Sequence, residues 1–260
     1  MLVIVFFASV IFLKAQQPLE TETARPLKKG VAEIQTTFEY QISKEGKELA
    51  VPFAFEYGIT DRLTILVEPV FYTSIRPKVG QRATSVGDLE ITLSYLVAKE
   101  TKRLPAFAIA GEVKLPTTKN QFISTGKTDF AAYIYASKRF GKFDTHANIG
   151  YTFVGKPRNF TASNTLNFAF ATEYFATKRL TLLGEVLVNG IGRKEVVVVP
   201  GVLVIISPEA AGGELVGTLG FRYKIKPNLS FSLGVSRDNS GATLFRPGFT
   251  YNFNLPKIKF

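Results

Sequence analysis

Large apolar residues alternate with small or polar residues along most of this chain. The alternation is clearest between residues 49 and 57, where every second position is large and apolar: Leu49, Val51, Phe53, Phe55 and Tyr57. A period of two puts successive side chains on opposite faces of an extended chain, so the pattern predicts a β-strand with one apolar face. A polar turn at residues 60–62 ends this strand, and the same alternation resumes from Leu63.

The pattern recurs often enough to predict about twelve strands. We expect them at residues 31–42, 49–58, 63–71, 88–97, 106–115, 129–137, 145–153, 166–174, 180–189, 215–225, 229–236 and 245–253. Strands of about ten residues, joined by turns that are short on one side and long on the other, are typical of outer-membrane proteins. The predicted fold is therefore all-β, a transmembrane antiparallel up-and-down β-barrel with an apolar outward register and a polar register facing the lumen.

One stretch, residues 195–207, is continuously apolar instead of alternating. Parity decides its interpretation, because the short turns near Arg179 and Lys226 should both lie on the periplasmic side of the membrane. Between these turns the chain must cross the membrane an even number of times, and two predicted strands already do so. We therefore expect residues 190–212 to form a strand extension and an extracellular excursion.

The two ends of the chain carry features of secretion and assembly. Residues 2–13 form a short apolar run followed by Lys14, Ala15 and Gln16, so residues 1–15 are predicted to be a signal peptide, although no basic residue precedes the run. The outer-membrane barrel domain then comprises residues 16–260. The terminal Phe260 follows an aromatic-rich strand and is similar to the signal that outer-membrane proteins present to the barrel-assembly machinery.

Composition supports a membrane protein and argues against several other classes. The formal net charge is +11, but the basic residues fall mostly in turns and loops, which indicates a rim facing anionic lipid and lipopolysaccharide instead of nucleic acid. The chain has no cysteine, which excludes disulfides and thiolate metal sites. No apolar run approaches the length of about 20 residues that a membrane helix needs. A soluble barrel would need a polar exterior, whereas the outward register is rich in Phe, Tyr, Leu, Val and Ile.

Charged residues of the strands fall on the register predicted to face the lumen. Those predicted to line a pore are Glu33, Glu39, Glu56, Glu68, Asp88, Glu90, Glu112, Asp129, His146, Glu173, Glu185, Arg222 and Arg246. The acids come from the first nine strands and the arginines from the last three, so one interpretation is an acidic wall that faces a basic wall and orients a charged or dipolar solute. The alternative is a set of ion pairs that fills the lumen, which a barrel of this size also allows.

His146 is the only histidine, so a metal site built from several histidines is excluded and a histidine-based catalytic centre has one candidate. A hydrolase would need a serine and an acid beside this residue, and no serine adjoins it in the sequence, which leaves partners from other strands open. Glycine-rich phosphate loops and carboxylate metal loops are missing. We therefore expect no enzymatic activity and no cofactor, and we interpret His146 as a hydrogen-bonded lining residue.

Six segments occur in an order that resembles the outer-membrane family named for the MetA pathway of phenol degradation: residues 58–69, 86–97, 113–120, 127–141, 146–155 and 221–238. The resemblance covers roughly residues 30–253. It implies an outer-membrane channel or transporter for small solutes, hydrophobic or aromatic, in a Gram-negative type of bacterium. Two alternatives stay open: a structural or adhesive barrel with a filled lumen, and an outer-membrane lipid-modifying hydrolase built around His146.

Overall fold

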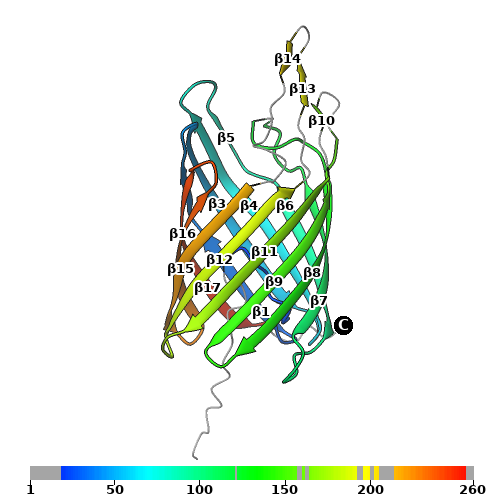
Figure 1. Cartoon of the computed structure of the whole chain (residues 1–260), viewed down its shortest axis with the longest axis vertical. Coiled ribbons are helices and arrows are strands. Elements are labelled where there is room, and N and C mark those ends of the chain that lie inside the picture. The colour runs from blue at the N-terminus through cyan, green and yellow to red at the C-terminus, as the bar shows by residue number, and fades with distance from the viewer. Residues whose placement is uncertain are drawn as a thin grey trace, which may run out of the picture.

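The computed structural model is a closed antiparallel β-barrel with twelve wall strands (Figure 1). It describes residues 19–120, 122–156, 160–161, 164–191, 196–199, 202–204 and 214–255. The first wall strand consists of two pieces, β1 (Val31–Thr37) and β2 (Glu39–Ile42), and β1 pairs with the last strand to close the sheet. The other wall strands are β3 (Gly46–Gly58), β4 (Leu63–Pro77), β6 (Leu89–Ala98), β7 (Ala106–Leu115), β8 (Asp129–Phe140), β9 (Phe143–Phe153), β11 (Thr165–Phe175), β12 (Leu180–Ile191), β15 (Glu214–Lys226), β16 (Leu229–Asp238) and β17 (Thr243–Asn254).

The alternation along the strands produces the two surfaces of the wall. Large apolar side chains such as Ile109, Ile134, Phe170 and Leu219 are exposed on the outside. Many of the positions between such residues carry small or polar side chains that are buried toward the lumen. This arrangement suits a bilayer, because lipid cannot hydrogen-bond to polar groups, and the predicted transmembrane barrel is confirmed. Among the described residues, no helix is long and apolar enough to cross a membrane.

The predicted strands are all present, and the largest difference lies at the long-loop end of the barrel. There β4 continues to Pro77, because it pairs with β3 on one side and with the short β5 (Ala83–Ser85) on the other. The predicted signal peptide at residues 1–15 and the predicted assembly signal at Phe260 lie outside the described residues.

The apolar stretch at residues 195–207 does not add a wall strand in the part of it that the structure describes. It contributes β13 (Val196–Val199) and β14 (Val202–Val204), which pair with each other and with β10 (Phe160–Thr161) in a separate small sheet. This sheet stands beyond the rim at the upper end in Figure 1. The parity argument is therefore confirmed for the described residues: β12 ends at Ile191, and the wall resumes only at β15.

Three short turns share the sequence Thr-x-Arg-Leu, and they begin at Thr60, Thr101 and Thr177. In each turn the threonine Oγ1 accepts hydrogen bonds from the backbone N–H groups two and three residues later, at distances between 2.9 and 3.3 Å. The side chain thereby satisfies donors that the strand ladder leaves at the turn. All three turns lie at the lower end in Figure 1, which we identify as the periplasmic side because its connections are short.

Gly58 is the last residue of β3, and it lies against the backbone of residues 27–30, which precede the first strand. A Cβ atom at this position would lie 2.3 Å from the backbone oxygen of Lys28 and 2.8 Å from that of Leu27. The Gly30 N–H also donates to the Gly58 carbonyl at 2.8 Å, so the two segments cannot separate without losing that bond. We expect Gly58→Ala to lower the free energy of unfolding by about 1–3 kcal/mol, the usual range for overpacking.

Thermal unfolding followed by the mobility of the folded barrel in gel electrophoresis would measure this loss. Gly111→Ala on β7 is the matched control, because nothing lies within 4 Å of a Cβ added there. Equal losses of stability in the two variants would show that the close contact of Gly58 with the backbone of Leu27 and Lys28 is not the cause.

Candidate functional site

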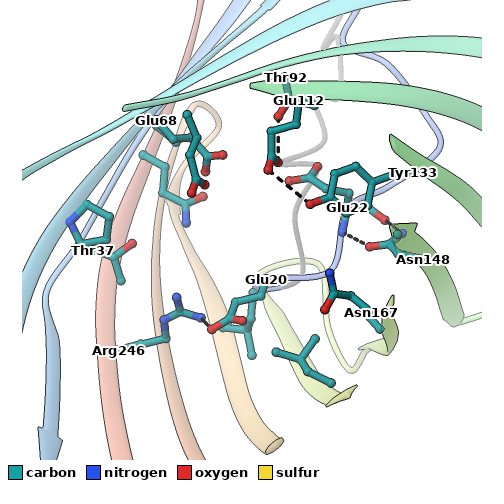
Figure 2. Close-up of a pocket in the computed structure, with 18 of the residues that line it drawn as sticks. Glu20, Glu22, Thr37, Glu68, Thr92, Glu112, Tyr133, Asn148, Asn167 and Arg246 are labelled. Carbon is teal, nitrogen blue, oxygen red and sulfur yellow. Dashed lines mark hydrogen bonds and ion pairs between the residues drawn. The ribbon is translucent and has the colours of Figure 1, made fainter. Parts of the chain in front are cut away.

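The lumen contains a stretch of chain whose position the sequence did not predict. Residues 19–25, here called the lumen segment, precede the first strand and run inside the barrel, where Thr21 and Ala24 are fully buried. Figure 2 shows Glu20 and Glu22 of this segment among the side chains of the wall. Alternation could not reveal it, because a short polar stretch before a strand has the same pattern in water as in a polar lumen.

Side chains of the barrel wall hydrogen-bond to the backbone of the lumen segment, as a neighbouring strand would in a sheet. Glu185 Oε1 on β12 accepts hydrogen bonds from Glu20 N at 3.0 Å and from both N and Oγ1 of Thr21 at 2.6 Å. The Asn148 side chain on β9 accepts from Glu22 N at 2.7 Å and donates to Glu22 O at 2.9 Å. Because a buried backbone group without a partner is costly, these contacts hold the segment in one position.

Arg25 anchors the lumen segment at the short-turn end of the barrel. Its guanidinium donates to both carboxylate oxygens of Asp144, at 3.1 and 2.9 Å, and twice to Glu100 Oε2, at 3.2 and 2.7 Å. Such forked geometry gives the strongest charge-assisted hydrogen bonds. Partial burial raises the pKa of Glu100, but hydrogen bonds from Arg139 N and from Arg25 outweigh it, and the pKa lies below its ordinary value. The ion pair is therefore intact at neutral pH and is lost only as the pH falls through that lowered value.

The lumen segment separates two cavities. The larger has a volume of about 360 Å³, includes Glu20 and Glu22 in its lining, and reaches Asn189 near the far end of β12. The smaller, of about 100 Å³, is lined by Thr23, by Arg25 and by the short turn that ends β11. We therefore expect passage along the barrel axis to require movement of the segment.

The structure distributes the predicted pore-lining residues over several places. The larger cavity is lined by Glu39, Glu68, Glu90, Glu112, Arg222 and Arg246. The smaller cavity is lined by His146, Glu173 and again Arg222. A minor recess between β1 and β3 holds Glu33 and Glu56, which are direct cross-strand partners. Glu185 binds the lumen segment, and the Lys114 ammonium near the long-loop end pairs with Asp129 and lies 4.0 Å from Asp88. A role of these residues in solute passage stays a prediction.

Acidic side chains follow five neighbouring strands around one side of the lumen. They are Glu33, Glu56, Glu68, Glu90 and Glu112, on β1, β3, β4, β6 and β7. The arginines on β15 and β17 are balanced by ion pairs, Arg222 with Glu173 at 3.2 Å and Arg246 with both Glu39 and Glu20. The acidic side is thus more extensive than any opposing basic side. Within the described ranges, no three His, Cys, Asp or Glu side chains are placed to hold a metal ion.

The fold brings Ser137 on β8 to His146, and Asp144 lies two residues before His146 on β9. His146 Nδ1 lies 2.9 Å from Ser137 Oγ, and its Nε2 lies 4.0 Å from Asp144 Oδ1. Ser137 is only 1% exposed, and its Oγ accepts a hydrogen bond from Ala24 N at 2.8 Å and contacts Thr23 Oγ1 at 3.2 Å. The hydroxyl therefore holds the lumen segment and is covered by it, which argues against a nucleophilic role in this arrangement.

Comparison with known proteins agrees with this architecture. The family model described as "Putative MetA-pathway of phenol degradation" matches residues 57–254. None of the curated proteins compared with this chain matches it.

Several solved structures share the fold. An outer membrane channel from Pseudomonas putida F1 is 10% identical, with a TM-score of 0.69 over 88% of this chain and 98% of that chain. The NanC porin is 9% identical, with a TM-score of 0.61 over 84% of this chain and 98% of its own. The KdgM porin is 10% identical, with a TM-score of 0.56 over 85% of this chain and 99% of its own. At such identities the likeness concerns the fold alone.

Proposed function

Because this chain belongs to the family named for the MetA pathway of phenol degradation, we propose that it is an outer-membrane channel for small solutes, closed along its axis by its own lumen segment. The observation that carries the proposal is the pair of cavities inside one closed barrel, separated by a single short stretch of chain. Small eight-stranded barrels are filled by their side chains, whereas a twelve-stranded wall encloses room for a passage once the segment moves.

The solutes that fit this proposal are compact, and hydrophobic or aromatic. The larger cavity, at about 360 Å³, falls in the range of roughly 300–1,000 Å³ typical of small-molecule sites. Its lining combines the aromatic side chains of Tyr133 and Tyr135 with the carboxyl groups of the acidic side. The name of the family, which refers to phenol degradation, supports the same class of compound.

The proposal includes a location and partners. The barrel would lie in the outer membrane of a Gram-negative type of bacterium, with its basic loops against lipopolysaccharide phosphates. Assembly machinery would recognise the terminal Phe260, and no nucleic acid would bind. We also propose that the protein has no enzymatic activity, because the Ser137 hydroxyl beside His146 is occupied by the lumen segment.

A cysteine pair tests whether the lumen segment closes the channel. Thr23 Oγ1 and Ser137 Oγ are 3.2 Å apart, and the chain contains no cysteine, so Thr23→Cys/Ser137→Cys introduces the only two thiols side by side. A disulfide between them would tether the segment to β8. We expect the oxidised double variant to pass no current in a planar bilayer, and we expect a reducing agent to restore the openings of the unaltered protein.

The single variant Ser137→Cys, given the same oxidant, controls for oxidation and for loss of the hydroxyl. Equal currents from the oxidised and reduced double variant would show that ions pass with the segment in place, which contradicts the proposed closure. No current and no solute uptake from any form would contradict the channel itself and favour a structural barrel with a filled lumen.

A further inference from the structure

The smaller cavity carries an excess of positive charge. Five cationic side chains line it against two carboxylates: Arg25, Lys178, Arg179, Arg222 and Lys224 against Asp144 and Glu173. Asp144 pairs with Arg25 at 2.9 Å. Glu173 pairs with Arg222 at 3.2 Å. The other three cations form no ion pair with any described residue. Since a cleft lined mainly by one sign of charge concentrates the opposite sign, this cavity favours an anion.

Two of these cations come from neighbouring strands and lie side by side. Lys224 N donates a hydrogen bond to the Arg179 carbonyl at 2.8 Å. Lys224 lies on the inward register of β15, two residues after Arg222. Like charges on adjacent strands repel each other, and an anion bound between them would remove that repulsion. A guanidinium beside an ammonium suits an oxyanion, because its forked N–H groups match two oxygen atoms.

His146 adds a buried polar atom without a partner to the same cavity. Its side chain is 3% exposed, and Nε2 forms no hydrogen bond with any described residue. Ser137 Oγ accepts from Ala24 N, and we assign its own proton to the 2.9 Å bond with His146 Nδ1. In this tautomer the ring proton is on Nε2. A buried donor without an acceptor is costly, and an anion in the cavity would supply the acceptor.

The size of the smaller cavity limits what it can hold. Its volume is about 100 Å³, whereas a cavity that binds benzene has a volume of about 150 Å³. The space therefore suits a compact oxyanion such as phosphate and excludes an aromatic solute. Because the cavity lies inside the barrel, the ligand would be a free ion and not a lipid headgroup.

We propose that the smaller cavity binds a small oxyanion of the phosphate class from the periplasm, and that this ion stabilises the lumen segment in its closed position. The second part rests on the proposed channel function. Thr23 and Arg25 belong to the lumen segment and line the cavity, so the site is complete only while the segment is in place. A ligand that binds one of two states shifts the equilibrium toward that state, and the anion would therefore favour closure.

The single histidine makes the site observable without any assay of transport. The full-length chain, labelled with ¹⁵N in histidine and carrying no added histidine tag, gives ring signals from His146 alone. The probe is inorganic phosphate, which replaces chloride at constant pH and constant ionic strength in a non-ionic detergent. We expect a saturable displacement of the Nε2 resonance in the nuclear magnetic resonance spectrum.

The chain contains its own matched control, because Thr-Lys-Arg-Leu occurs both at residues 101–104 and at residues 177–180. Only the second of these turns lines the smaller cavity. We expect Lys178→Ala/Arg179→Ala to weaken phosphate binding at least tenfold and Lys102→Ala/Arg103→Ala to leave it unchanged. Lys224→Gln removes a cation from a different element and should also weaken binding, so the result does not depend on one turn folding correctly.

No saturable displacement in the unaltered protein, or equal binding by the two turn variants, would overturn the site. This result does not depend on whether the barrel conducts, so it leaves the proposed channel function standing.

Currents in planar bilayers test the effect of the anion on closure. We expect phosphate on the short-turn side to reduce the openings of the unaltered protein severalfold, and to have no such effect on Lys178→Ala/Arg179→Ala. Binding in the resonance experiment with unchanged openings would overturn the link to closure. Absence of current from every form would overturn the proposed channel function, and with it the link to closure, while the resonance experiment would still decide the site.

Discussion

Replacing Arg25 with alanine is expected to raise the channel current severalfold, because the lumen segment loses its anchor. With the segment in place, the variant would leave Asp144, whose side chain is 5% exposed, without the guanidinium that pairs with it. Removing one partner of a buried ion pair costs about 3–5 kcal/mol, and the partial exposure of Arg25 and Glu100 puts this site at or below the low end. The cost applies only while the segment covers Asp144, so the equilibrium shifts toward the displaced segment and the open lumen.

Lys29→Ala is the matched control for Arg25→Ala. Lys29 follows the lumen segment in the chain and is exposed, and its backbone N–H donates a hydrogen bond to Asp61 at 3.2 Å. The control therefore removes one positive charge without touching the anchor, and its current in planar bilayers should equal that of the unaltered protein. A rise of the same size in both variants would trace the effect to net charge. No rise in Arg25→Ala would mean that Glu185 and Asn148 hold the segment without Arg25.

Membrane-facing positions could be predicted from the sequence because lipid imposes the same rule on every strand. Leu93 and Tyr95 are exposed and Thr92 is buried, as the alternation in β6 indicates, and this holds whichever strand is the neighbour. The rule weakens where the wall leaves the bilayer. The alternation therefore does not predict the extension of β4 to Pro77, because at the rim neither face of a strand contacts lipid.

Contacts across the lumen could not be predicted in the same way. An alternating pattern indicates which face of the sheet a residue is on. It does not indicate which residue that side chain contacts across the lumen. The alternation predicts that His146 faces the lumen. Its contact with Ser137 depends on the register between β8 and β9, and the capping of Ser137 depends on the path of the lumen segment. Likewise Phe38 and Pro247 are far apart in the sequence, and the Phe38 N–H donates to the Pro247 carbonyl only because the sheet closes.

Replacing Glu68 and Glu90 with glutamine is expected to remove most of the preference of the open channel for cations over anions. The two carboxyl groups line the larger cavity and are direct cross-strand partners on β4 and β6. Across the lumen, Arg222 and Arg246 are held in ion pairs, so the fixed charge that a passing ion meets is mainly negative where the carboxyl groups are ionised. Rings or walls of carboxylates select for cations in other channels by the same electrostatics.

The reversal potential under a salt gradient at alkaline pH measures this preference, and the Arg25→Ala background keeps the channel open during the recording. Glu45→Gln/Glu48→Gln, at exposed positions around the start of β3, removes the same charge away from the cavity and should leave the reversal potential unchanged. Folding should not confound the comparison, because like charges directly opposite each other destabilise a sheet by about 0.2–1 kcal/mol and the variant relieves this repulsion. An unchanged reversal potential in Glu68→Gln/Glu90→Gln would show that ions do not pass the acidic side of the lumen, and the predicted pore-lining role of these two residues would be wrong.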